Sequence, residues 1–222
     1  MKGELADNAQ TPLCEGAMED VSPPSPGGRH LPFLIRRDGV WLYRGTPVKR
    51  KAMVCLFASL LTRDEQGAYL LRSPFESGFI TVEDVPFLAV ELQWHGAGRN
   101  QRLCFRTNMD ETVTADADHP IRAVWDVPPE ACIEGCPPYL LIRPGDGAFG
   151  LEARLARSVW YELAALAEPG TCRGVPCLGV WSCGSFFPLA RLPSENGDAS
   201  MPESSAPQSP DAHGAPGGTP CV

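Results

Sequence analysis

The sequence predicts an α+β fold, in which two helices accompany a larger set of short β-strands. Two segments, residues 48–62 and 151–167, carry apolar side chains at helical spacing. Elsewhere in the middle of the chain, short aliphatic and aromatic runs end at clusters of Gly, Pro, Asn and Asp, which is the pattern of strands and turns. The composition, with 43% hydrophobic and 21% charged residues, is that of a globular domain with a packed core.

The folded body is expected at residues 31–192, between two tails. Residues 1–30 and 193–222 hold few large apolar side chains, so neither tail can offset the entropy of ordering, and both are expected to be disordered. The N-terminal tail has five acidic and two basic residues, and the C-terminal tail has four acidic residues and no Lys or Arg, so the two tails carry −7 of the net charge of −8. A nearly neutral body argues against general binding of nucleic acid, which needs a basic surface.

Neither an export signal nor a membrane span is predicted. No apolar run follows the N-terminal residues, and the longest dense run, residues 53–61, has about half of the ~20 residues that a spanning helix needs. We therefore expect a soluble, cytoplasmic protein without membrane contact. Its nine cysteines are an odd number and are expected to be reduced. The Cys-x3-Cys spacing from Cys132 and the wider spacings from Cys172 differ from zinc knuckles, so neither a metal site nor a cofactor is predicted.

The first part of the body is predicted to begin with a strand at residues 40–43, after a turn at Asp38 and Gly39. Thr46 and Pro47 suit the N-cap and the first position of the helix at residues 48–62. Two further strands are expected at residues 68–72 and 79–82.

The second part is predicted to open with an antiparallel hairpin of residues 87–94 and 102–107 around a glycine-containing turn. Further strands are expected at residues 112–115, 121–127 and 139–143. The helix at residues 151–167 and two strands at 178–182 and 185–189 complete the body.

The order strand, turn, helix, strand occurs twice, first around Arg44 and again around Arg143. This repeated order of elements favours a duplicated strand–helix–strand core. The alternative is that two ordinary strand–helix–strand units share an order without a common origin.

The body also resembles a known family. The segments that carry the resemblance are DGVWLYRGTPVKRKAMVCLFASLL at 38–61, YLLRSPFE at 69–76, ITVEDVPFLAVEL at 80–92, residues 105–108, residues 118–121 and LGVWSCGSFFPLA at 178–190. In this order they resemble domain-of-unknown-function family 1285 over nearly all of residues 35–190. The chain departs from the family pattern at Ser77-Gly78, where a larger residue is usual, and at Cys183, where a second glycine is usual.

The resemblance implies a bacterial protein with a duplicated core, whose C-terminal half is similar to a pleckstrin-homology domain: an antiparallel sheet with a packed helix. It also implies a nucleotide-type or nucleic-acid-type ligand between the halves and a role in signalling. We accordingly expect an N-terminal α/β subdomain at residues 31–78 and a pleckstrin-homology-like subdomain at residues 79–192.

The candidate ligand-binding residues are polar residues at turns and segment ends, near the seam expected between the halves. They are Arg44, Lys49, Arg50, Arg72, Glu76, Glu83, Asp84, Asn108 and His119. Lys49 and Arg50 stand at the start of the first helix, where cations and free N–H groups together favour a phosphate, unless they are solvated surface charges. We expect a pocket bordered by at least Arg44, Glu83 and Asn108, unless the acidic members pair with arginines for structural reasons.

These features favour a non-enzymatic protein in bacterial signalling, which binds an anionic, nucleotide-like small molecule at the junction of two subdomains. One alternative is a protein-interaction scaffold that uses Trp181, Phe186 and Phe187, with a partner that the sequence does not identify. The other is a hydrolase that uses Asp118 and His119. A turn-fixing role is favoured for His119, because no nucleophile motif accompanies it.

Overall fold

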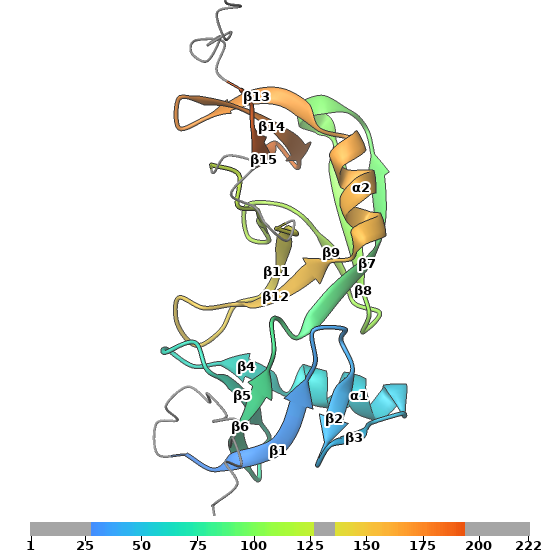
Figure 1. Ribbon diagram of the computed structural model, residues 1–222, viewed down its shortest axis with the longest axis vertical. Helices are drawn as coiled ribbons and strands as arrows, with labels where there is room; N and C mark the ends of the chain where they lie inside the picture. Colours follow the sequence, from blue (N-terminus) through green and yellow to red (C-terminus); the bar gives the residue numbers. More distant parts are fainter. Residues whose placement is uncertain (1–27, 127–135, 194–222) are drawn as a thin grey trace, which may run out of the picture. The chain divides into compact units, whose positions relative to one another are not determined.

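The computed structural model describes residues 28–126 and 136–193. These residues form three sheets and two nine-residue helices, so the fold is mostly β with few helices (Figure 1). Both helices and most of the strands were predicted, but five strands were not. The tails predicted to be disordered lie outside the described residues, apart from a few residues at their inner ends.

The first sheet has six strands in the order β3-β2-β1-β6-β5-β4. They are β1 (His30–Ile35), β2 (Trp41–Tyr43), β3 (Thr46–Pro47), β4 (Leu61–Arg63), β5 (Tyr69–Arg72) and β6 (Ser77–Val82). Neighbouring strands are antiparallel except β1 and β6, which are parallel. Because β6 pairs with β1 and β5, this sheet continues past residue 78, the boundary predicted for the first subdomain.

Helix α1 (Lys51–Ser59) connects β3 to β4 and packs against the sheet through aromatic rings. The ring of Phe33 on β1 lies 4.9 Å from that of Phe57 on α1, measured between centroids. The helix is shorter than predicted, because Thr46 and Pro47 pair with β2 as β3 and do not cap the helix.

The second sheet has the order β10-β11-β12-β7-β8-β9. Its strands are β7 (Phe87–His95), β8 (Arg102–Thr107), β9 (Thr112–Thr114), β10 (Ile121–Arg122), β11 (Tyr139–Arg143) and β12 (Leu151–Leu155). The predicted hairpin is present as β7 and β8, with a short 3-10 helix, η1 (Gly98–Asn100), in its turn. The strands β7 and β12 pair in parallel, and the other neighbours are antiparallel.

Helix α2 (Arg157–Ala165) follows β12 and lies along β7 (Figure 1). The predicted helix began at Leu151, which is a correction: residues 151–155 form β12. Leu151 and Leu155 are four residues apart, as on a helix, but Ala153 between them is also buried, and alternate burial is the period of a strand.

The third sheet is a meander of β13 (Glu168–Cys172), β14 (Val175–Ser182) and β15 (Ser185–Arg191). Ser182 is fully buried and joins it to the second sheet: its Oγ accepts from the Leu103 N–H at 2.9 Å and donates to the Ala115 carbonyl at 2.6 Å. The rings of Trp181 and Phe186 contact each other.

Three hairpins have two-residue turns in which both residues have positive φ angles. Arg44 and Gly45 have φ of 50° and 76°, and the pairs at residues 173–174 and 183–184 are alike. These are the angles of type I′ turns, whose twist matches that of the flanking strands.

Buried apolar residues from all three sheets form a continuous core. Neither described helix has the length and hydropathy that crossing a bilayer would require.

Candidate functional site

A cavity of about 680 Å³ lies between the first sheet and the β10–β12 part of the second. Small-molecule sites typically have volumes of ~300–1,000 Å³. The lining residues are Arg37, Arg63, Tyr69, Asp84, Val85, Arg122, Val124, Cys136, Pro137, Tyr139, Glu152 and Arg154. Charged side chains therefore lie beside apolar and aromatic side chains in this cavity.

One wall is a row of side chains in register across β10, β11 and β12. Arg122 is the cross-strand partner of Tyr139, and Tyr139 is the partner of Arg154. Arg122 donates to both carboxylate oxygens of Glu152, at 2.8 and 2.6 Å, and its guanidinium lies 4.6 Å from the Tyr139 ring. The hydrogen bonds to Glu152 raise the pKa of Arg122, which is fully charged.

Asp84 joins this wall to the first half of the chain. It lies in the short connection from β6 to β7, and its carboxylate accepts a hydrogen bond from the Tyr139 hydroxyl at 3.2 Å. Its other oxygen is 3.5 Å from Nε of Arg154, whose Nη2 donates to the carbonyl of Arg37 at 2.7 Å. Burial and the nearby Asp84 charge raise the pKa of Tyr139, so its hydroxyl keeps its proton and serves as a donor.

Arg63, at the end of β4, is held from several sides. Its Nε donates to the Gly67 carbonyl at 2.8 Å, and its Nη1 donates to the Gly150 carbonyl at 3.2 Å. The guanidinium also lies 4.6 Å from the centre of the Tyr69 ring and 5.1 Å from that of Phe149. The Arg63 charge is therefore fixed in place by neutral groups from both halves of the chain.

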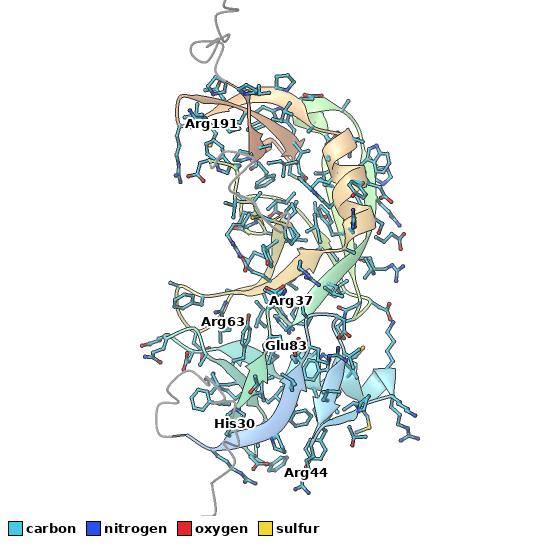
Figure 2. The ribbon with its side chains drawn as sticks, viewed as in Figure 1. His30, Arg37, Arg44, Arg63, Glu83 and Arg191 are labelled. Carbon is cyan, nitrogen blue, oxygen red and sulfur yellow. The ribbon has the colours of Figure 1, made fainter. Side chains whose placement is uncertain are left out.

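The cavity carries an excess of positive charge. Four arginines and two carboxylates line it, which gives a net charge of +2. Glu152 and Asp84 pair with Arg122 and Arg154, whereas no carboxylate in the described part of the chain pairs with the guanidinium of Arg37 or Arg63 (both labelled in Figure 2). An anion would find two uncompensated cations there.

Asp84 is the predicted site residue that lines this cavity, and Glu83 and Asn108 contact backbone near the connection that carries it. Glu83 accepts a hydrogen bond from the backbone N–H of Arg37 at 2.8 Å. Asn108 accepts one from the N–H of Leu88 at 3.0 Å and so fixes the start of β7. Glu83 and Asn108 thus act through the backbone, on either side of the connection between β6 and β7.

The pocket expected to be bordered by Arg44, Glu83 and Asn108 is not the one found, because none of these three residues lines the cavity. Arg44 is at the opposite end of the first sheet from Arg37 (Figure 2), and Lys49 and Arg50 are exposed before α1.

Three predicted residues are engaged with neighbours outside the cavity. Arg72 pairs with Asp146 at 2.6 Å, and Glu76 pairs with Arg29. His119 contacts Asp116, which also accepts from the His119 N–H at 2.8 Å, so His119 belongs to a turn. Although burial opposes it, these hydrogen bonds lower the pKa of Asp116.

The cavity residues that the sequence did not single out were mostly on strands. Glu152 and Arg154 alternate with buried residues in β12, and Arg122 follows the buried Ile121 in β10. Polar residues in a strand pattern whose other face is buried were the available signal, and the assignment of residues 151–155 to a helix concealed it.

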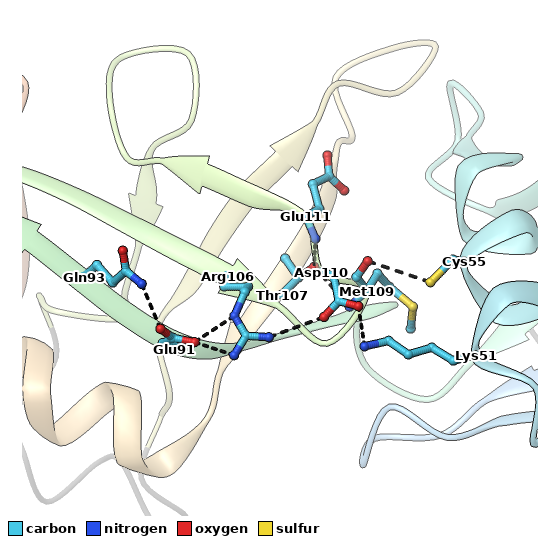
Figure 3. A network of polar contacts seen from close by, with 9 residues as sticks. All are labelled: Lys51, Cys55, Glu91, Gln93, Arg106, Thr107, Met109, Asp110 and Glu111. Atoms are coloured by element: carbon cyan, nitrogen blue, oxygen red, sulfur yellow. Dashed lines mark hydrogen bonds and ion pairs between the residues drawn. The ribbon is translucent and has the colours of Figure 1, made fainter.

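A second polar site joins α1 to the second sheet (Figure 3). Lys51 pairs with Asp110, Arg106 pairs with both Asp110 and Glu91, and Cys55 Sγ lies 3.8 Å from the Met109 carbonyl. Hydrogen bonds from Gln93 and Arg106 lower the pKa of Glu91, and the contact with Lys51 lowers that of Asp110.

Residues 19–85 match the N-terminal domain, and residues 86–189 the C-terminal domain, of a protein family of unknown function, DUF1285. A crystal structure of a DUF1285 family protein from Silicibacter pomeroyi DSS-3 is 39% identical, with a TM-score of 0.63 over 73% of this chain and 81% of that one. One from Shewanella baltica OS155 is 24% identical, with a TM-score of 0.42 over 60% and 89%. No curated protein matches the chain.

Proposed function

The chain belongs to the DUF1285 family, as its sequence indicated, and from this premise we propose that it is a non-enzymatic protein that binds a small anionic ligand in the cavity between its halves. The supporting observation is the charge of the cavity: Arg37 and Arg63 have no carboxylate partner among the described residues. Arg63 is held in place before an anion arrives, which strengthens its attraction for one, and Arg37 adds a second positive charge.

The proposed ligand is nucleotide-like. A planar guanidinium binds phosphate oxygens with directional hydrogen bonds, which suits Arg37 and Arg63 to a phosphate group. The aromatic side chains of Tyr69 and Tyr139, with Val85 nearby, offer a surface for a planar ring. Asp84 provides an acceptor for hydroxyl or amino groups.

A role in cytoplasmic signalling is the second part of the proposal. Arg63, Asp84, Tyr139 and Arg154 line the cavity and also join the two halves of the chain. A ligand that competes for these contacts would change how the halves are held. Binding that differs between two arrangements shifts their populations, which is the physical basis of a signal.

We also propose that the chain contains a duplicated strand–helix–strand core, with a pleckstrin-homology-like second half. The supporting observation is the repeated order of elements. Each nine-residue helix is followed by a three-stranded antiparallel meander, β4-β5-β6 after α1 and β13-β14-β15 after α2. In the second half, α2 packs on a largely antiparallel sheet.

Ligand binding is tested with the full-length chain and a panel of inorganic phosphate, nucleotides and their unphosphorylated nucleosides. We expect a phosphate-bearing compound to raise the melting temperature, and its nucleoside to have little effect. Replacement of Arg37 by alanine should weaken that binding by about 10-fold or more, because a charge-assisted hydrogen bond contributes ~1.5–3 kcal/mol.

The matched control is Arg36→Ala, which removes the adjacent arginine. Arg36 pairs with Asp38 at 3.5 Å and does not line the cavity. An equal loss of affinity in Arg36→Ala and Arg37→Ala would mean that the anion is attracted by the general positive charge and is not bound in this cavity. A panel in which no anion stabilises the protein would contradict the proposed function.

A further inference from the structure

Helix α1 presents to solvent a face that is both apolar and basic. Leu56 is 58% exposed and Met53 is 42% exposed, and residues three apart are neighbours on a helix. Arg44, Lys49 and Arg50 are exposed as well and precede the helix, with Arg50 at its N-cap, and no ion pair with a described residue neutralises these three. Exposed apolar side chains with a charged rim are typical of an interaction surface.

The apolar part of this face continues onto β2. Tyr43 is 40% exposed, and its ring lies 4.9 Å from that of Phe33, which in turn lies 4.9 Å from Phe57 of α1. The guanidinium of Arg44 is 5.4 Å from the Tyr43 ring. We call the resulting surface the α1 face; it consists of Tyr43, Arg44, Lys49, Arg50, Met53 and Leu56.

A segment of this same chain has the complementary chemistry. Residues 13–21, which precede the described part, read LCEGAMEDV. They carry three acidic residues, Glu15, Glu19 and Asp20, among the apolar Leu13, Met18 and Val21. The match to the family's N-terminal domain begins at residue 19 and so includes the end of this segment.

The segment is also within reach. The described chain begins just before β1, and Phe33 of β1 pairs with Tyr43, while the Arg44 N–H donates to the Pro32 carbonyl at 2.8 Å. Neighbouring strands are about 4.8 Å apart, so β3 lies about 10 Å from β1. Residues 22–28 can span up to about 25 Å when extended.

We propose that residues 13–21 dock on the α1 face, with their carboxylates on Arg44, Lys49 and Arg50 and their apolar side chains on Met53 and Leu56. Attachment to β1 holds the segment at a millimolar effective concentration, so weak contacts suffice. The α1 face is thereby covered within one chain and becomes available to an acidic, apolar partner only when the segment leaves.

The test measures how fast peroxide oxidises Met53 in the full-length chain, by peptide mass spectrometry. A triple variant, Glu15→Lys with Glu19→Lys and Asp20→Lys, should oxidise Met53 about threefold faster or more, because repulsion replaces attraction on a face that is otherwise mostly covered. Met109, whose side chain packs against the core, should oxidise at an unchanged rate and reports an intact fold.

The matched control places the same change of charge in the C-terminal tail, as Glu195→Lys with Asp198→Lys and Glu203→Lys. It should leave the oxidation of Met53 at the wild-type rate. Equal Met53 rates in all three proteins would overturn the proposal. The proposal would also be overturned if Met53 lost its protection from oxidation on dilution, which would identify a second copy as the occupant. The same holds if only the C-terminal variant oxidised Met53 faster.

Discussion

The two halves of the chain meet at two polar sites that use the same kinds of side chain but differ in charge. In the network of Figure 3, Lys51 and Arg106 are matched by Glu91 and Asp110. In the cavity, four arginines face two carboxylates. The network shows that the halves can be joined by ion pairs without surplus cations. The charge of Arg37 and Arg63 is therefore not needed to join the halves, because Arg63 does so through neutral carbonyls and rings, and under the proposed function this charge attracts the ligand.

The largest expected effect tests the joining contacts of the cavity. Arg154 and Asp84 are 23% and 19% exposed, and Arg154 also holds the Arg37 carbonyl. Replacing Arg154 by alanine leaves a partly buried carboxylate with fewer partners, which should cost about 2–3 kcal/mol of unfolding free energy. For a chain of this size, the melting temperature should fall by about 4–10 °C.

A second variant makes that test specific. Arg154→Ala combined with Asp84→Asn should recover part of the lost stability, because the unpaired carboxylate is removed as well. Arg157→Ala, on the exposed side of α2, serves as the control and should melt close to the wild type. If Arg154→Ala unfolded at the wild-type urea concentration, the cavity would not be a joint between the halves.

The next effect separates charge from geometry in the cavity. Arg63→Lys keeps the positive charge but loses the planar group that lies between Tyr69 and Phe149 and bonds two carbonyls. We expect the affinity for a phosphate-bearing ligand to fall by about 10-fold, since a lysine does not reproduce bidentate or stacked contacts. Calorimetric titration measures this. Undiminished affinity would show that net charge alone attracts the anion.

A smaller effect, dependent on pH, is expected in the balanced network. The folded protein lowers the pKa of Glu91 and of Asp110, so their contribution to stability is present above the unfolded pKa of about 4 and is lost as the pH falls through the folded values. The Arg106→Gln variant loses the part of this contribution that Arg106 provides, while the contacts from Gln93 and Lys51 remain. The urea midpoints of the wild type and of Arg106→Gln should therefore differ at pH 7 and converge near pH 3. Their affinities for the ligand should be equal at pH 7. A constant difference in midpoint would contradict this.

The smallest effect lies outside both sites and provides a reference for them. Cys183 has a φ of 48° in the turn between β14 and β15, which favours Asn or Gly. The Cys183→Asn variant should be more stable by about 0.5 kcal/mol, which corresponds to 1–2 °C in melting temperature. Ligand affinity should not change. A destabilised variant would show that the thiol has a role that the turn geometry does not explain.

Much of the fold was predictable, because local patterns determine it. The strand at β2, the hairpin of β7 and β8, and the final pair β14 and β15 all follow turn signals and apolar runs. Prediction was poorer where the spacing of apolar residues fits both a helix and a strand, as at residues 151–155. Within β7, a register shift between Ala89 and Glu91 places Phe87, Ala89 and Leu92 in the core, so simple alternation fails there. Such bulges depend on the partner strand and leave no local signature.

The cavity was less predictable than the fold, since it depends on pairing between distant segments. Polar residues at turns were natural candidates, and Asp84 is one that lines the cavity. Arg122, Tyr139 and Arg154 meet only because three strands align in register. No spacing in the sequence expresses that alignment.

The parallel pairing of β7 with β12 also has a consequence for how the chain folds. Phe87 is aligned with Ala153, 66 residues further along. The β7–β8 hairpin can close quickly, whereas pairing across so long a loop is slow because closure entropy is lost before contacts form. The wall that carries Tyr139 and Arg154 is thus completed late. We expect the capacity to capture an anion to appear with the slowest phase of refolding, and β7 to need protection from intermolecular strand pairing until then.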